Sequence, residues 1–109
     1  MDVYKIEQEK EWCQLIAVSV RMDGIQISGH ANYSYDGYDI VCAGVTALTQ
    51  TLIKSIEDLA EDEIEYEISP GEVDIHYGNL SEKAKTLVDS FFIGICVIAG
   101  EFPDNVRIV

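Results

Sequence analysis

The sequence predicts an α+β fold with the element order ββαββαβ, a mostly antiparallel sheet with two helices packed on it. Short segments in which every second residue is apolar, separated by turn residues, predict the strands. Two longer segments repeat apolar residues every three or four positions, which predicts helices. With 109 residues, 48% of them hydrophobic, the chain is long enough to form one domain with its own core. Helices gathered on one face of such a sheet are typical of α+β sandwiches.

Two hairpins account for four of the strands. The first covers residues 14–28 with a turn at RMDG, and the second covers 64–77 with a turn at Ser69-Pro70-Gly71. The residues that alternate along these strands are Ile16, Val18, Val20, Ile25 and Ile27, then Ile64, Tyr66, Ile68, Val73, Ile75 and Tyr77. We treat residues 1–109 as a single domain. For residues 1–12, an N-terminal extension and an additional edge strand both stay open.

The first helix is predicted to begin after Asp39, whose carboxylate can accept hydrogen bonds from the free amides of the first turn. Its buried stripe would consist of Val41, Val45, Leu48, Leu52, Ile56 and Leu59. Acidic residues follow and oppose the helix dipole, so the pattern does not fix the end near Ala60.

The second helix is predicted after Asn79 or Ser81, either of which can cap it. Its apolar positions are Ala84, Leu87, Val88, Phe91, Phe92, Ile95 and Ile98. The later half is apolar nearly all round, so we expect burial on more than one side, with Cys96 in the core. Gly100 and Pro103 would end the helix, and Val106 and Ile108 would form a short last strand.

Composition excludes several classes of function. A net charge of −13 argues against direct contact with nucleic acid, which requires clustered Lys and Arg. The carboxylates either attract a basic partner or simply keep the protein in solution. The apolar run at residues 91–100 is too short to span a membrane, and three cysteines without framework spacing suggest a reducing compartment. With no signal peptide pattern at the N-terminus, we expect a cytoplasmic protein.

Neither a cofactor nor a metal ion is expected. His30 and Cys42, with eleven residues between them and no second close pair, do not form a zinc signature. The acidic residues lack the spacing of a calcium loop, and the glycines form no phosphate-binding or dinucleotide-binding motif.

The candidate chemistry lies in His30 and Cys42. Cys42 would lie in the first turn of the first helix, where free amides and the dipole stabilise a thiolate. The small residues Ala43 and Gly44 would leave room for a substrate backbone, and the amides of Cys42 and Ala43 could hold an oxyanion. His30, at the end of a strand, could take the thiol proton and later protonate a leaving amine. An inert cysteine and a histidine satisfied by water are the alternative interpretation. Cys13 and His76 have no such surroundings.

These residues form a longer motif, GHA at 29–31, GYDIVCAG at 37–44 and AL at 47–48. It resembles the motif of the bacterial ribosomal-processing cysteine protease (Prp) family, from about Gln14 to Val109. The resemblance implies a homodimeric thiol protease with a His–Cys pair and a flexible loop over its site. It also implies that the substrate is the N-terminal extension of a large-subunit ribosomal protein.

By position in that motif, Cys42 would be the nucleophile and His30 the general base and acid. Asp39 would orient His30 or cap the helix. Gly37 would belong to the mobile loop, and Thr46 stands where the family often has serine. A non-catalytic module that binds a ribosomal partner is the alternative.

The loop between the two candidate residues contains three tyrosines, Tyr33, Tyr35 and Tyr38. They could cover apolar side chains of an extended peptide, with Gly37 allowing the backbone to move. Equally, they could only pack the loop against the domain.

Overall fold

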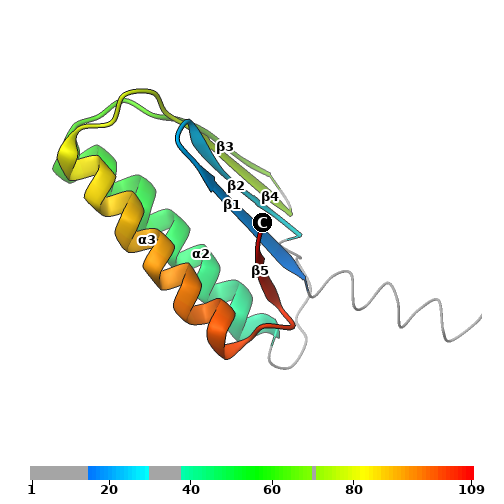
Figure 1. Cartoon of the computed structure of the whole chain (residues 1–109). Helices are drawn as coiled ribbons and strands as arrows, with labels where there is room; N and C mark the ends of the chain where they lie inside the picture. Colours follow the sequence, from blue (N-terminus) through cyan, green and yellow to red (C-terminus); the bar gives the residue numbers. More distant parts are fainter. Residues whose placement is uncertain (1–14, 30–37, 70) are drawn as a thin grey trace, which may run out of the picture.

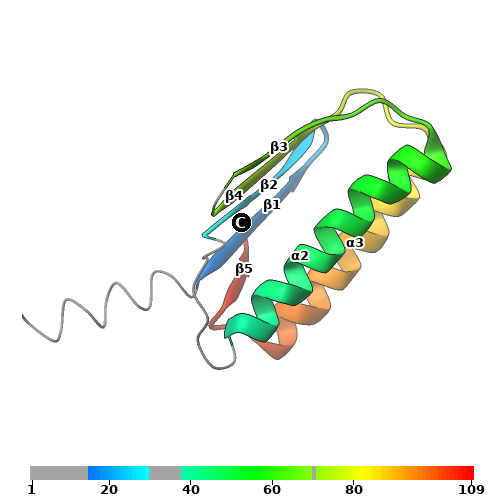
Figure 2. The same cartoon turned by 180° about the vertical axis from the view of Figure 1, so that it is seen from behind.

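The computed structural model describes residues 15–29, 38–69 and 71–109. The elements are β1 (Ile16–Arg21), β2 (Gly24–Ser28), α2 (Tyr38–Ser55), η1 (Ile56–Ala60), β3 (Glu65–Ser69), β4 (Glu72–His76), α3 (Glu82–Glu101) and β5 (Val106–Ile108). The five strands form one sheet in the order β3-β4-β2-β1-β5. Only β5 runs parallel to its neighbour, β1. Both helices pack on the same face of the sheet (Figures 1 and 2), which confirms the predicted α+β fold and its element order.

Both predicted hairpins are present. In the first, Val18 lies opposite Ile27 and Val20 lies opposite Ile25. The second joins the first through the antiparallel pairing of β4 with β2. The Tyr77 hydroxyl donates to the carbonyl oxygen of Arg21 at 2.8 Å, and the Tyr77 amide donates to that of Asp23 at 3.1 Å. These bonds hold the end of β4 beside the turn between β1 and β2.

The core lies between the sheet and the helices. Its most buried large side chains are Ile16, Val18, Ile27, Val41, Val45, Ile56, Ile75 and Ile95. The helices approach each other through small residues, because a Cβ built on Gly94 would lie 3.0 Å from Leu48 Cδ1. Thr49 is buried in α2, and its hydroxyl donates to the Val45 carbonyl at 2.7 Å, so this polar group is satisfied.

The predicted stripe of the first helix is correct as far as Ile56 and wrong at Leu59, which is 61% exposed. After Ser55 the chain continues as a π-helical turn, and the Glu61 amide donates to the Ile56 carbonyl at 2.9 Å. A π turn holds more residues than an α turn, so it shifts the phase of every later side chain. A prediction that continues the α-helical period of 3.6 residues past Ser55 therefore places Leu59 on the buried side of the helix, whereas the π turn places it on the exposed side.

Ser81 caps the second long helix, as one of the two predicted residues. Its hydroxyl oxygen accepts from the Ala84 amide at 3.2 Å. The same hydroxyl donates to Asp62 Oδ1 at 2.6 Å, and the Ser81 amide donates to Asp62 Oδ2 at 2.8 Å. The Ser81 hydroxyl, and after it the Ser81 amide, lower the pKa of the Asp62 carboxyl, because both stabilise its charged form. One serine therefore joins the cap of α3 to the chain that leaves η1.

The later half of α3 differs from the prediction. Cys96 was expected in the core but is exposed, and so are Ile93 at 64% and Val97 at 61%. The sheet and α2 together cover only one side of α3, so an apolar sequence all round the helix does not mean burial all round. No helix in the described parts of the chain is long and apolar enough to cross a membrane.

Candidate functional site

Cys42 lies near the beginning of α2 and is half-buried. It packs at the border of the core, between Val41 and Val45, which are 2% and 0% exposed along the same helix. A thiol there is held in place by its neighbours and still reaches the surface. Thr46 follows one helical turn later, on the same side, and is also half-buried.

The helix begins earlier than predicted, which changes the expected role of two amides. Because α2 starts at Tyr38, Asp39 lies inside the first turn instead of preceding it. Only the first four amides of a helix lack an internal partner, so those of Cys42 and Ala43 already belong to the hydrogen bonds of α2. The expectation that these two amides hold an oxyanion is therefore wrong. The free amides precede Cys42.

The two small residues after Cys42 have different surroundings. Ala43 is exposed, as a residue beside a substrate would be. Gly44 is half-buried, and a Cβ built on it would lie 3.4 Å from Ile98 Cδ1 of α3. A methyl group at position 44 would therefore make only an ordinary contact with α3, so helix packing does not require glycine here.

Gly29 fixes the point where the chain leaves β2, directly before His30. It has a φ of 85°, and a Cβ there would collide with the carbonyl oxygen of Leu15, so only glycine fits. Its amide donates to the carbonyl oxygen of Gly71 at 3.1 Å. The end of β2 and the start of α2 lie at the same end of the molecule (Figure 1), which is the arrangement that the predicted pair requires. His30, Tyr33, Tyr35 and Gly37 themselves lie outside the described residues.

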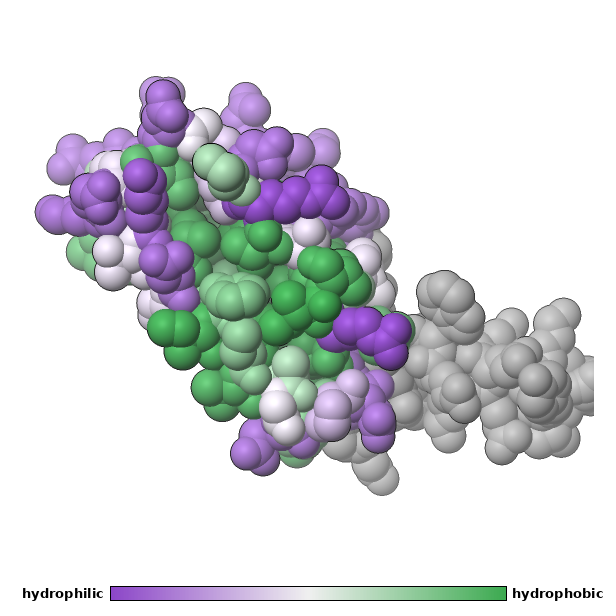
Figure 3. All heavy atoms as spheres, in the orientation of Figure 1, coloured by the Kyte–Doolittle hydropathy of each residue, from purple (hydrophilic) through white to green (hydrophobic). Residues whose placement is uncertain are grey.

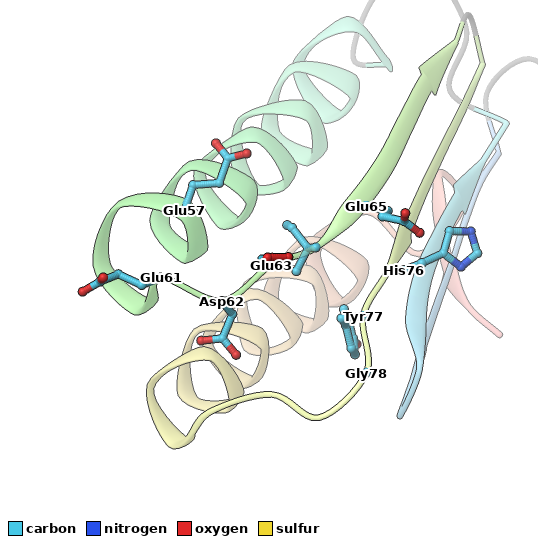
Figure 4. A pocket seen from close by; sticks show the side chains of 9 residues that line it. Glu57, Glu61, Asp62, Glu63, Glu65, His76, Tyr77 and Gly78 are labelled. Atoms are coloured by element: carbon cyan, nitrogen blue, oxygen red, sulfur yellow. The ribbon is translucent and has the colours of Figure 1, made fainter.

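A second feature lies at the opposite end of α2. A hollow of about 750 Å³ is lined by Glu57, Glu61, Asp62, Glu63, Ile64, Glu65, His76, Tyr77 and Gly78. Glu57 follows Cys42 by fifteen positions, about 22 Å along a helix, so this hollow is not part of the Cys42 site. Figure 4 shows its carboxylates spread round the rim and pointing in different directions. Among the described residues, no three His, Cys, Asp or Glu side chains lie in positions from which they could together hold a metal ion.

Sequence reasoning missed this hollow. The pattern that could have indicated it is the acidic run after the first helix. Burial, and secondarily the charge of Asp23, raise the pKa of Tyr77 at its edge. His76, which was expected to have no special surroundings, is exposed in β4 and lines this hollow.

Comparison with known proteins gives a consistent result. Residues 7–107 match the family model described as cysteine protease Prp. The ribosomal processing cysteine protease Prp of Bacillus subtilis (strain 168) is 27% identical over 90 residues, covering 76% of this chain and 80% of that protein. The Prp of Staphylococcus aureus (strain Mu50 / ATCC 700699) is 24% identical over 91 residues, covering 81% of this chain and 86% of that protein.

Solved structures share the fold. SMU.848 from Streptococcus mutans superposes with a TM-score of 0.80 at 25% identity, covering 87% of this chain and 92% of that one. The Prp protease from S. aureus in complex with a substrate peptide gives a TM-score of 0.73 at 19% identity, covering 87% and 96%. The match to the family model extends over most of the chain and includes Cys42, so this chain belongs to the Prp family of cysteine proteases.

Proposed function

We propose that this chain is a cytoplasmic cysteine endopeptidase that removes the N-terminal extension of a large-subunit ribosomal protein during ribosome assembly. The observation that carries the proposal is the family match over residues 7–107, together with a half-buried cysteine near the start of α2. The proteins of B. subtilis and S. aureus that it resembles are named ribosomal processing cysteine proteases.

In the proposed mechanism, His30 takes the proton of the Cys42 thiol, and the thiolate attacks the carbonyl carbon of the scissile peptide. The tetrahedral intermediate collapses to a thioester as His30 protonates the departing amine. His30 then activates a water molecule that hydrolyses the thioester and frees Cys42. The positive end of the α2 dipole favours the thiolate. Asp39, in the first turn, either orients His30 or strengthens that helix end.

The substrate would lie in extended form beneath the 32–38 loop. Tyr33, Tyr35 and Tyr38 would cover its apolar side chains, and Gly37 would let the loop close over it. The exposed Ala43 leaves the adjacent surface of α2 open to the peptide backbone. Closure would exclude water from the thioester until the amine product has left.

Cleavage of a peptide that spans the ribosomal extension tests this proposal. Cys42→Ala and His30→Ala should each abolish cleavage, and the double variant should be little worse than either, because members of a catalytic pair act together. Lys83→Gln, an exposed change on α3 outside the proposed site, is the control and should retain most of the activity. Cleavage by Cys42→Ala would rule out the protease. In that case the alternative, a module that binds a ribosomal partner without cutting it, would hold.

We further propose that the chain forms a homodimer through the apolar face of α3, made of Phe92, Ile93, Cys96 and Val97. These side chains are exposed, and Figure 3 shows apolar residues gathered over α3. Contiguous apolar surface of this kind marks an interaction site in soluble proteins. A second copy fits, because this face bears no charge while the chain carries −13, so two copies can meet here without bringing carboxylates together.

A further inference from the structure

Among the described residues, strand β3 lies at the edge of the sheet with one side unpaired. It is the first strand in the sheet order and pairs only with β4 among the described elements. All five of its residues are exposed, and Figure 2 shows it at the border of the sheet. An edge of this kind offers unpaired amides and carbonyl groups to another extended chain.

The two faces of β3 differ in chemistry. Tyr66 lies opposite Ile75 and Ile68 opposite Val73, so both belong to the face that the helices cover elsewhere. The helices do not reach over β3, and Tyr66 and Ile68 remain 42% and 57% exposed. On the other face of the strand lie Glu65 and Glu67.

The acidic face of β3 contains a repulsive pair. Glu67 lies directly opposite Asp74 on β4, and like charges in such positions destabilise a sheet. The ion pairs found among the described residues join Lys54 to Asp58 and Lys85 to Glu82, so neither neutralises this pair. A cationic side chain placed beside Glu67 would relieve the repulsion.

This charge pattern decides which extended chain fits the edge. Antiparallel pairing of two copies of β3 about Glu67 would place the two Glu67 side chains opposite each other, and this repulsion disfavours a second copy in that register. A segment in which basic and apolar residues alternate matches both faces at once, because side chains of a strand alternate between its faces. Proteins that contact ribosomal RNA carry such cationic segments, since they must neutralise phosphates.

We propose that the free edge of β3 binds an extended cationic segment of the substrate protein as an additional strand, outside the scissile peptide. Basic side chains would lie beside Glu65 and Glu67, and apolar ones beside Tyr66 and Ile68. That this segment belongs to the substrate protein rests on the proposed function. The preference of the β3 edge for a strand of alternating basic and apolar residues does not depend on that function. The turn after β3 lies next to Gly29, through the bond from the Gly29 amide to the Gly71 carbonyl. A strand added here therefore leads toward the end of the molecule that holds Cys42.

A binding measurement with a defined probe tests the edge. The probe is a fluorescein-labelled peptide of alternating lysine and valine, and the protein is the full chain carrying Cys42→Ala. Anisotropy should show binding that weakens about ten-fold when alternate backbone amides of the probe are N-methylated, because these can no longer donate to the edge. Glu67→Lys should weaken it by about ten-fold as well. Glu82→Lys is the matched control, the same change of charge on exposed α3, and should have less than about a two-fold effect.

Equal losses of affinity for the probe in Glu67→Lys and Glu82→Lys would contradict a binding site at β3, because the probe would then respond only to the total charge of the protein. Equal binding of the methylated and unmethylated probes would also overturn it. With active protein, Glu67→Lys should slow cleavage of the whole ribosomal protein and leave a short peptide unaffected. If Glu67→Lys changed the cleavage rates of the whole protein and of the short peptide by the same factor, relative to the unmodified chain, the assignment of the bound segment to the substrate would be overturned. If the active chain cleaved neither, the proposed function would fail, while the probe would still decide on the edge.

Discussion

At the scale of single residues, the two described cysteines of this chain have opposite surroundings. Cys42 is half-buried near the positive end of a helix, and Cys96 is exposed on the later half of α3. Reactivity of a thiol depends on how far the thiolate is stabilised, and exposure alone does not provide this. We therefore expect Cys42 to be the faster-reacting thiol, although Cys96 is the more exposed of the two in a single chain.

Iodoacetamide labelling at different pH values separates the two thiols. We expect Cys42 to reach half its maximal rate well below pH 8.5, the usual pKa of a free thiol, because the helix start and His30 favour its thiolate. Mass spectrometry of the labelled peptides identifies each site, and Cys96→Ser should leave the profile of Cys42 unchanged. Faster labelling of Cys96 near pH 6 would contradict the assignment of Cys42 as the activated thiol.

At the scale of elements, α3 and η1 are joined by Asp62 and Ser81. Asp62 accepts from both the hydroxyl and the amide of Ser81, and Ser81 in turn caps α3. The bonds form best with a charged carboxylate, which is why the pKa of Asp62 is lowered. A carboxyl whose pKa falls on folding stabilises the folded state above its unfolded pKa and loses this effect as pH falls through the folded value.

Asp62→Asn should therefore lower Tm slightly at neutral pH, and the difference from the unmodified chain should begin to shrink below about pH 4 and vanish only as the pH falls through the lowered pKa of Asp62. Asp104→Asn, a change at an exposed aspartate, serves as the control. At each pH its Tm should be nearly the same as that of the unmodified chain. Thermal unfolding followed by circular dichroism across pH 3–7 measures both. A difference between Asp62→Asn and the unmodified chain that is the same at every pH would show that Asp62 acts without its charge.

At the scale of the whole molecule, charge and apolar surface are separated. Carboxylates surround the hollow at the η1 end and the outer face of β3, whereas the later half of α3 carries the apolar face. The first half of α3 is charged, with Glu82, Lys85 and Asp89. Within the described part of this strongly acidic protein, the later half of α3 is thus an uncharged surface, which is suited to a symmetric interface between copies.

Light scattering after size exclusion tests the dimer. The unmodified chain should have twice its mass of 12.2 kDa. Ile93→Lys combined with Val97→Lys should weaken association by at least about 100-fold, because both charges would be buried without partners. The control is Thr86→Lys. Thr86 lies on the same side of α3 as Ile93, two turns earlier, and this variant should stay dimeric. A monomeric unmodified chain, or a dimeric Ile93→Lys/Val97→Lys double variant, would contradict the proposed interface.

The sequence by itself determined the order of the elements and both hairpins, and it narrowed the cap of the second helix to Asn79 or Ser81, because these depend on local periodicity and on turn and cap chemistry. It also placed Cys42 near a helix start. The boundary of that helix was predicted less well, since Asp39 could serve equally as a cap or as a first-turn residue. The consequence was the wrong choice of amides for an oxyanion.

Only the tertiary structure decided which apolar residues are buried. Periodicity shows which residues share a side of an element, but coverage of that side depends on how far the neighbouring elements extend. Cys96 and Val97 are exposed because nothing among the described residues packs on the outer side of α3, and Ile68 is exposed because the helices end short of β3. Leu59 is exposed because a π turn, a product of packing rather than of pattern, rotates it away from the core.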